Sequence, residues 1–155
     1  MKKNQLATTI YSSTEIQLHY KRPLFIKMKH INSAEKAQEV IKEFADSQRI
    51  DLKEFFWVLM LSNANRLLGI SEIASGSSRG VVINIKEILQ LALMTSSSAI
   101  ILAHNHPSGN LTISECDKRL TEKLQQVAEI LEITLLDHII ISSESFTSFS
   151  KEGLL

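Results

Sequence analysis

The segment AIILAHNHPSGNLTISECDKRLTEKLQQVAEILEITLLDHIIIS, residues 99–142, contains the strongest indications of the fold. Its first five residues form an apolar run of strand length that stops at His104. A segment rich in turn-forming residues follows, and Ser114 then begins a helix whose apolar residues recur every three or four positions. Residues 134–142 predict a second strand. This alternation of strand, helix and strand is typical of an α/β protein.

The sequence before this segment predicts a helix, a strand hairpin, a short strand and a second helix. In chain order these elements cover residues 34–48 with Ser33 as N-cap, 54–62 paired with 66–74, 81–84, and 86–96. The C-terminal FTSFSKEGLL is expected to be an extension that packs Phe146 and Phe149. The complete order predicts an α/β sandwich around a mixed sheet.

Length and composition exclude several classes of protein. A chain of 155 residues with 44% hydrophobic and 22% charged residues suits one folded domain. Cys116 is the only cysteine, which excludes both a disulfide-stapled scaffold and a zinc finger with two cysteine ligands. No stretch approaches the roughly 20 apolar residues that span a bilayer, and the N-terminus lacks the apolar core of a signal peptide. We therefore expect a cytoplasmic protein without a membrane partner.

The charge is unevenly distributed although the net charge is zero. Residues 1–30 hold six basic side chains and one acidic side chain, whereas residues 31–155 carry the compensating negative charge. We interpret residues 1–30 as a basic arm and residues 31–155 as the folded domain. The alternation in EIQLHYK, residues 15–21, predicts an edge strand that Pro23 limits. The arm is either a solvated tail or edge strand, which is the simpler interpretation, or a segment that contacts phosphate or docks on its own folded domain.

A metal-binding pattern lies at the end of the strand over residues 99–103. His104 and His106 are two residues apart, so an extended backbone directs both imidazoles to the same side. The turn that follows can return the chain and place Asp117, in the first turn of the next helix, beside them. Two histidines and one carboxylate suit Zn²⁺ and leave a fourth position open for water.

Three residues near this pattern have a structural interpretation as well. Ser114 and Asp117 fit the S-x-x-D pattern of a helix capping box, and one pair can serve both the cap and a metal. Cys116 falls on the apolar helix face with Leu120, so we predict a core residue rather than a ligand. His138 alternates with its neighbours in a predicted strand, and we leave it out of the metal site.

The whole pattern H-x-H-P-S-G-x4-S-x-x-D resembles the signature of the JAMM, or MPN-plus, metalloproteases. Three longer segments, FFWVLML…NRLLGISEIASGS, AIILAHNHPSGNLTISECD and LLDHIIISSESFTSFSKEGLL, are similar to the RadC family, whose members are often labelled as DNA-repair proteins. The resemblance covers roughly residues 31–155 and implies a cytidine-deaminase-like α/β sandwich. Members commonly carry an N-terminal helix-hairpin-helix region, and we expect this chain to be a short form without one.

The resemblance also implies roles for individual residues. The positions that match the zinc ligands are His104, His106 and Asp117, and Ser114 matches a serine that stabilises the developing oxyanion. A family glutamate at the start of the first buried strand matches Glu54, which is expected to act as general acid and base. Glu72 and Glu87 are the alternative candidates for that role.

These inferences favour a zinc-dependent hydrolase of amide bonds, of the peptidase or isopeptidase type. The alternative is a RadC-type module associated with DNA repair, whose metal site is structural or regulatory. Because the net charge is zero, we expect DNA binding to be weak at most. A nucleobase deaminase would need a P-C-x-x-C ligand pair, which one cysteine cannot provide. The edge strand of the arm offers a possible homodimer contact.

Overall fold

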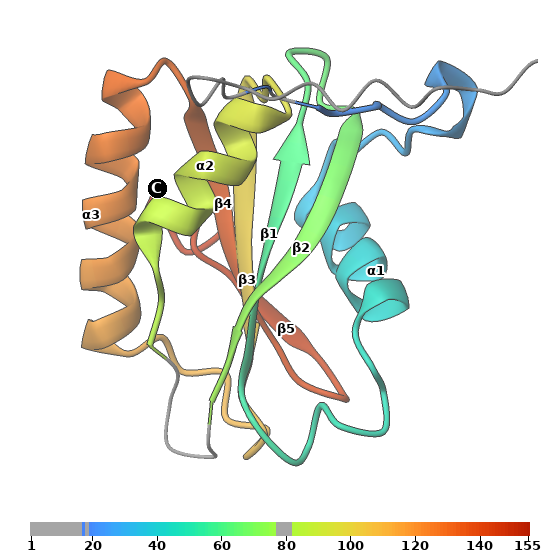
Figure 1. Ribbon diagram of the computed structural model, residues 1–155. Coiled ribbons are helices and arrows are strands. Elements are labelled where there is room, and N and C mark those ends of the chain that lie inside the picture. The colour runs from blue at the N-terminus through green and yellow to red at the C-terminus, as the bar shows by residue number, and fades with distance from the viewer. Residues whose placement is uncertain (1–16, 18, 77–81) are drawn as a thin grey trace, which may run out of the picture.

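The computed structural model describes residue 17, residues 19–76 and residues 82–155 (Figure 1). In this part of the chain, helices cover both faces of one five-stranded sheet. The strands are β1 (Phe55–Leu61), β2 (Leu67–Ser75), β3 (Ala99–Asn105), β4 (Thr134–Ile141) and β5 (Phe146–Ser148). The helices are α1 (Ala34–Phe44), α2 (Ile85–Met94), α3 (Glu115–Ile130) and the 3-10 turn η1 (Phe25–Lys27). The prediction of a mixed α/β fold is confirmed.

The sheet has the strand order β2-β1-β3-β4-β5. β1 is antiparallel to both β2 and β3, β3 and β4 are parallel, and β5 is antiparallel to β4. Every residue of β1 and β3 is buried, because α1 covers one face of the sheet while α2 and α3 cover the other (Figure 1). This double cover explains why both strands are continuous apolar runs in the sequence.

The antiparallel pairing of β1 with β3 gathers the predicted site residues at one end of the sheet. Phe56, near the start of β1, lies opposite His104, near the end of β3. α3 begins at the same end, which is the lower end in Figure 1. Glu54, the two histidines of β3 and its following turn, and the first turn of α3 are therefore close in space although they are far apart in sequence.

A β-bulge in β4 determines which side chains of that strand face each helix layer. Ile100 pairs with Leu135 and Ile101 pairs with Asp137, so Leu136 is an extra residue in β4. Because one extra residue reverses the alternation of side chains, His138 shares the α2 and α3 face with its partner Leu102.

Two short segments that the sequence predicts to be strands are not strands where the structure describes them. Gln17 and residues 19–23 of the arm are not in a strand, and the rest of the predicted edge strand lies outside the described residues. Residues 82–84 are also not in a strand, because they lead directly into α2 with Asn84 as its N-cap, whereas Val81 lies outside the described residues.

The end of α1 and the buried face of α3 also differ from the prediction. The helix predicted over residues 34–48 ends at Phe44, because the following Ala45 has an extended backbone, and Phe44 itself is exposed. In α3, Cys116 is exposed and is not the predicted core residue. The buried residues of α3 are Thr121, Leu124 and Ala128, and Leu120 of the predicted face is partly buried against the same core, so the helix is rotated only slightly from the predicted face. This rotation brings the side of α3 that carries Asp117 toward the sheet.

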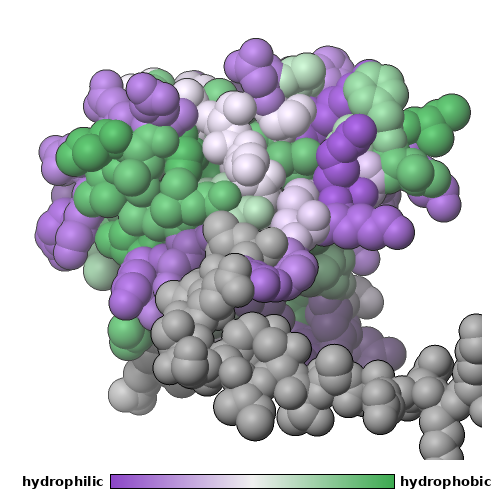
Figure 2. All heavy atoms as spheres, turned by 45° about the horizontal axis from the view of Figure 1, so that its top comes forward, coloured by the Kyte–Doolittle hydropathy of each residue, from purple (hydrophilic) through white to green (hydrophobic). Residues whose placement is uncertain are grey.

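The opposite end of the sheet exposes apolar side chains. Figure 2 shows hydrophobic surface there on the side of α2 and α3, and again on the side of η1. The exposed large apolar residues of these elements and their ends are Leu24, Phe25, Ile26, Leu93, Met94, Ile130 and Leu131. In the part of the chain that the structure describes, no helix has the length and apolar character needed to cross a membrane.

Candidate metal centre

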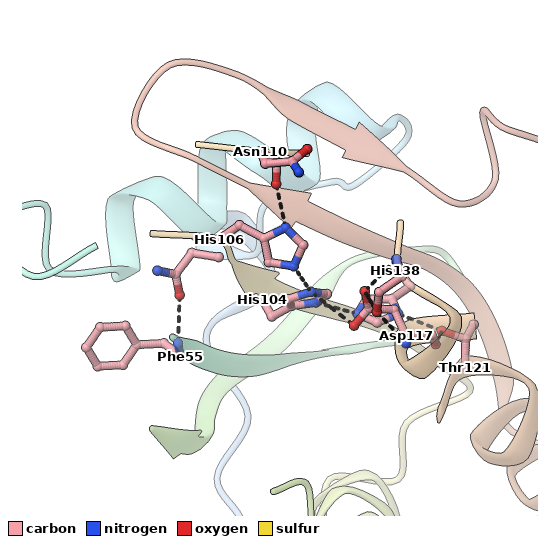
Figure 3. Close-up of polar contacts among 9 residues, drawn as sticks. Phe55, His104, His106, Asn110, Asp117, Thr121 and His138 are labelled. Atoms are coloured by element: carbon pink, nitrogen blue, oxygen red, sulfur yellow. Dashed lines mark hydrogen bonds and ion pairs between the residues drawn. The ribbon is translucent and has the colours of Figure 1, made fainter. Parts of the chain in front are cut away.

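The structure brings the three predicted metal-binding side chains together (Figure 3). His104, His106 and Asp117 each offer one ligand atom, and these atoms lie within 4.8 Å of one another. His104 Nε2 is 3.0 Å from His106 Nε2 and 3.4 Å from Asp117 Oδ1. Ligand atoms about 2.0–2.1 Å from a tetrahedral Zn²⁺ are about 3.3 Å apart, so the observed spacing and donor types fit that ion.

His104 is buried, and this burial keeps its ring uncharged. Its side chain is 1% exposed, and its ring is stacked on Phe56 with 5.9 Å between the ring centroids. Burial lowers the pKa of His104 to about 4, and the charge of Asp117 opposes this shift. The ring is therefore neutral near pH 7, which is the form of histidine that binds metal ions.

His106 lies in the turn after β3, and this turn orients its ring. The backbone N–H of His106 donates to the carbonyl oxygen of Ile141, and Gly109 N–H closes the turn onto the carbonyl of His106. Gly109 has a φ of 77°, a left-handed conformation that favours glycine. His106 Nδ1 lies 2.6 Å from the carbonyl oxygen of Asn110, which can only accept a hydrogen bond. In neutral His106, Nδ1 thus carries the hydrogen and the lone pair of Nε2 faces His104.

Asp117 serves the helix cap and the cluster at the same time. Its Oδ2 accepts hydrogen bonds from the backbone N–H of Ser114 at 3.0 Å and from Ser114 Oγ at 2.5 Å. Ser114 Oγ in turn accepts from the backbone N–H of Asp117, which completes the predicted capping box. Oδ1 remains directed at His104. The capping box is confirmed, and the position of Oδ1 leaves Asp117 available as a metal ligand, which stays a prediction.

Glu54 is half-buried and lies directly before β1. Burial raises the pKa of Glu54, while the charge of His106 lowers it and that of Asp117 raises it. The charges of two cluster residues thus act on this carboxylate. Glu72 is exposed in β2, and Glu87 lies in the first turn of α2. The assignment of the general acid and base to Glu54 stays a prediction.

Asn105, between the two histidines, is a positioning residue that the sequence analysis missed. It is fully buried, and its Oδ1 accepts the backbone N–H of Phe55 at 2.7 Å. Its Nδ2 donates to the carbonyl oxygens of Ile50 at 2.6 Å and Lys53 at 2.9 Å. One side chain of β3 thus holds the backbone on both sides of Glu54. The only sequence signal was alternation, which directs Asn105 away from the face of His104 and into the core.

His138 is a second residue whose place the sequence did not indicate. It is fully buried beside His104, with its Nε2 2.8 Å from His104 Nδ1. On its other side, Nδ1 lies 2.6 Å from Thr121 Oγ1 (Figure 3). Burial lowers the pKa of His138 well below its usual value. His138 lies outside the group of His104, His106 and Asp117, but it contacts His104.

Comparison with known proteins identifies the family. The family model described as RadC-like JAB domain matches residues 31–154. The chain belongs to the RadC family. A UPF0758 protein of Flavobacterium johnsoniae is 32% identical over 152 residues, which are 96% of this chain and 63% of that protein. A UPF0758 protein of Pelodictyon phaeoclathratiforme is 36% identical over 139 residues, which are 90% of this chain and 60% of that protein.

A third relative, a UPF0758 protein of Haemophilus ducreyi, is 35% identical over 132 residues, or 85% of this chain and 59% of that protein. The RadC-family chain thus spans about three fifths of the length of these curated relatives. The name that the relatives share specifies no activity.

Proposed function

We propose that this RadC-family domain is a zinc-dependent hydrolase of amide bonds, of the peptidase or isopeptidase type. The observation that carries the proposal is the convergence of three ligand atoms near a half-buried carboxylate whose pKa is raised. Within the part of the chain that the structure describes, the ligand group contains three residues and no fourth. A zinc site with three protein ligands is typical of catalysis, whereas structural sites have four.

His104, His106 and Asp117 would hold the Zn²⁺ ion. When bound, the ion would supply Lewis-acid chemistry, because it lowers the pKa of water and polarises the carbonyl of a substrate. The two imidazoles remain neutral ligands, while Asp117 contributes a negative charge that partly neutralises the cation. The bonds of Asp117 Oδ2 to Ser114 keep Oδ1 directed at the cluster.

Glu54 would move the proton during hydrolysis. In this proposal its carboxylate takes a proton from the attacking water and then donates it to the leaving amine. The raised pKa of Glu54 supports this role, since an acid–base catalyst works best when its pKa is close to the working pH. Asn105 holds the backbone on both sides of Glu54 through Lys53 and Phe55, and it thereby limits how far the carboxylate can move.

Ser114 would stabilise the negative charge that develops on the carbonyl oxygen. Its side chain is exposed, so a substrate can reach the hydroxyl. In the structure the hydroxyl donates to Asp117 Oδ2, and it must turn toward the substrate to act. The backbone N–H of Ser114 also binds Asp117 Oδ2, so this carboxylate stays in place when the hydroxyl turns.

An association with DNA is the second candidate function, and the basic arm is the observation that favours it. Lys21, Arg22 and Lys27 are exposed near η1, whereas Lys29 pairs with Glu43. These few cations support weak phosphate contacts at most. We therefore propose peptide or isopeptide substrates for the site and assign no specific DNA recognition to the arm.

The hydrolase proposal is tested by incubating the protein with an unbiased peptide library and with isopeptide-linked peptide pairs. Products are identified by mass spectrometry for the zinc-loaded protein and for the same preparation after chelation. We expect cleavage that disappears on chelation and returns when zinc is added. If the zinc-loaded protein leaves both substrate classes intact, or if chelation leaves cleavage unchanged, the proposal is wrong.

A further inference from the structure

We propose that His138 and Thr121 form a positioning pair that fixes His104 in its metal-binding tautomer and connects it to the backbone of Asp117. This pair lies behind the ligand group, on the side away from the proposed metal. The inference deepens the proposed function and depends on it only for the identity of the metal.

Three consecutive hydrogen bonds make up the connection (Figure 3). His104 Nδ1 lies 2.8 Å from His138 Nε2, and His138 Nδ1 lies 2.6 Å from Thr121 Oγ1. Thr121 Oγ1 then lies 2.7 Å from the carbonyl oxygen of Asp117, four residues earlier in α3. All three side chains that contribute to this connection are buried. The bonds therefore form where water cannot replace them.

The donor and acceptor of each bond follow from the bond between Thr121 and the carbonyl oxygen of Asp117. The carbonyl oxygen of Asp117 can only accept, so the single hydroxyl hydrogen of Thr121 points to it. Thr121 must then accept from His138, which places a hydrogen on His138 Nδ1. A neutral His138 with that hydrogen has a lone pair on Nε2 and accepts from His104 Nδ1. His104 consequently keeps a lone pair on Nε2.

This lone pair is the one that faces the other ligands. Nε2 is the atom of His104 that lies 3.0 Å from His106 Nε2 and 3.4 Å from Asp117 Oδ1. The opposite tautomer would place a hydrogen between these atoms and block a metal ion. Hydrogen bonds behind ligating histidines commonly set tautomer and orientation in this way. Because the connection ends on the backbone of Asp117, it also links His104 in β3 to α3, the helix that carries Asp117.

Thr121 offers a clean test, because valine has nearly the same shape as threonine but lacks the hydroxyl. The Zn²⁺ affinity is measured by competition with a chromogenic chelator for the wild type, Thr121→Val and Thr121→Ser. We expect Thr121→Val to weaken zinc binding about 10-fold to 100-fold, the usual cost of removing such a partner, and Thr121→Ser to restore wild-type affinity.

Thr95→Val is the matched control. Thr95 Oγ1 donates to the carbonyl oxygen of Leu91, also four residues earlier, at the end of α2 and away from the ligand group. It should lose a similar hydrogen bond and keep the zinc affinity. Thermal unfolding of each variant shows whether it is folded. Equal zinc affinity in Thr121→Val and the wild type, or an equal loss in Thr95→Val, would overturn the proposal.

A measurement on the metal-free protein tests the hydrogen-bonded pair independently of the proposed function. In the metal-free wild type, two-dimensional ¹⁵N NMR of the imidazole rings reports which nitrogen carries the hydrogen. We expect Nδ1–H in both His104 and His138, and Nε2–H in either ring would refute the positioning pair. If the wild type has these tautomers and yet binds no zinc, the proposed function fails while the hydrogen-bonded pair stands.

Discussion

The two ends of the sheet differ in the side chains that they bury and expose. At the end that holds the candidate metal centre, His104, His138 and Asn105 are buried, and each makes hydrogen bonds. At the other end, apolar residues of η1 and of the ends of α2 and α3 are exposed to solvent (Figure 2). The two ends lie about one strand length apart, because a strand of seven residues such as β3 spans about 20 Å.

From this contrast we expect substitutions at the two ends to have different effects. Buried polar groups destabilise a fold unless they are paired, so a cluster of them indicates a site that the fold is built to position. Exposed apolar and basic side chains require no such support and can contact other molecules without affecting that site. Substitutions at the centre should therefore change metal binding and chemistry, whereas matched substitutions at the far end should not.

The largest expected effect is the loss of the metal. Elemental analysis of protein purified without chelator should give about one zinc per chain, and His104→Ala combined with His106→Ala should abolish it because two of the three ligands are gone. His30→Ala, at the far end, is the control and should keep full zinc content. Full zinc occupancy in the double variant would show that the metal lies elsewhere.

Glu54→Gln should separate chemistry from metal binding. The amide keeps the shape of the side chain but cannot take a proton, so we expect zinc content to remain and turnover to fall about 100-fold or more. The measurement is the cleavage rate of a substrate found in the library, together with elemental analysis. Glu72→Gln, in the exposed edge strand β2, should retain wild-type turnover. A fully active Glu54→Gln protein would contradict the assignment.

The sequence predicted well those features that depend on local pattern. Ser114 was identified as the N-cap of α3, and the i, i+2 spacing of His104 and His106 placed both rings on one side of the chain. The convergence of Asp117 with these rings also followed, because a short turn joins the strand to the helix. Each of these inferences requires only neighbouring residues and the geometry of a strand or a helix.

Features that depend on distant partners were missed. The bulge at Leu136 depends on how β4 pairs with β3, so the sequence of β4 alone did not show that His138 would face His104. The rotation of α3 exposes Cys116 and buries Thr121, which is stable there because its hydroxyl has partners in the fold. The cytidine-deaminase-like label for the fold stays a prediction.

Asn105→Ala should destabilise the fold around the candidate metal centre. It removes the partner of one buried backbone N–H and two carbonyl groups in residues 50–55, and each unpaired group costs about 1–3 kcal/mol. We expect the free energy of unfolding in urea to fall by about 3 kcal/mol or more. Asn63→Ala, in the exposed turn between β1 and β2, should change it by less than about 0.5 kcal/mol. Similar losses in the two variants would remove the distinction between the ends.

The metal-free protein should lose stability as the pH falls below about 6.5. Burial lowers the pKa of His104 to about 4, and that of His138 lies well below its usual value. Below pH 6.5 the unfolded chain gains protons that the folded chain does not, so each histidine destabilises the fold by up to about 1.4 kcal/mol per pH unit, down to its folded pKa. Urea unfolding between pH 7 and pH 4 measures this slope. His104→Gln should reduce it and His30→Gln should not, and an unchanged slope in His104→Gln would contradict this cause.

The smallest expected effect is on the affinity for DNA. Nonspecific affinity increases with the number of phosphates that a protein neutralises, and only Lys21, Arg22 and Lys27 are exposed and outside the ion pair of Lys29 in the described part of the arm. We expect fluorescence anisotropy with labelled duplexes at near-physiological salt to give a dissociation constant no tighter than about 10⁻⁶ M and no sequence preference. Replacing these three residues by Gln should weaken even this binding and leave zinc content unchanged, because they lie near the start of β2, at the end of the sheet away from the metal centre. A dissociation constant near or below about 10⁻⁸ M would place the protein among specific DNA binders and would favour the repair-associated function.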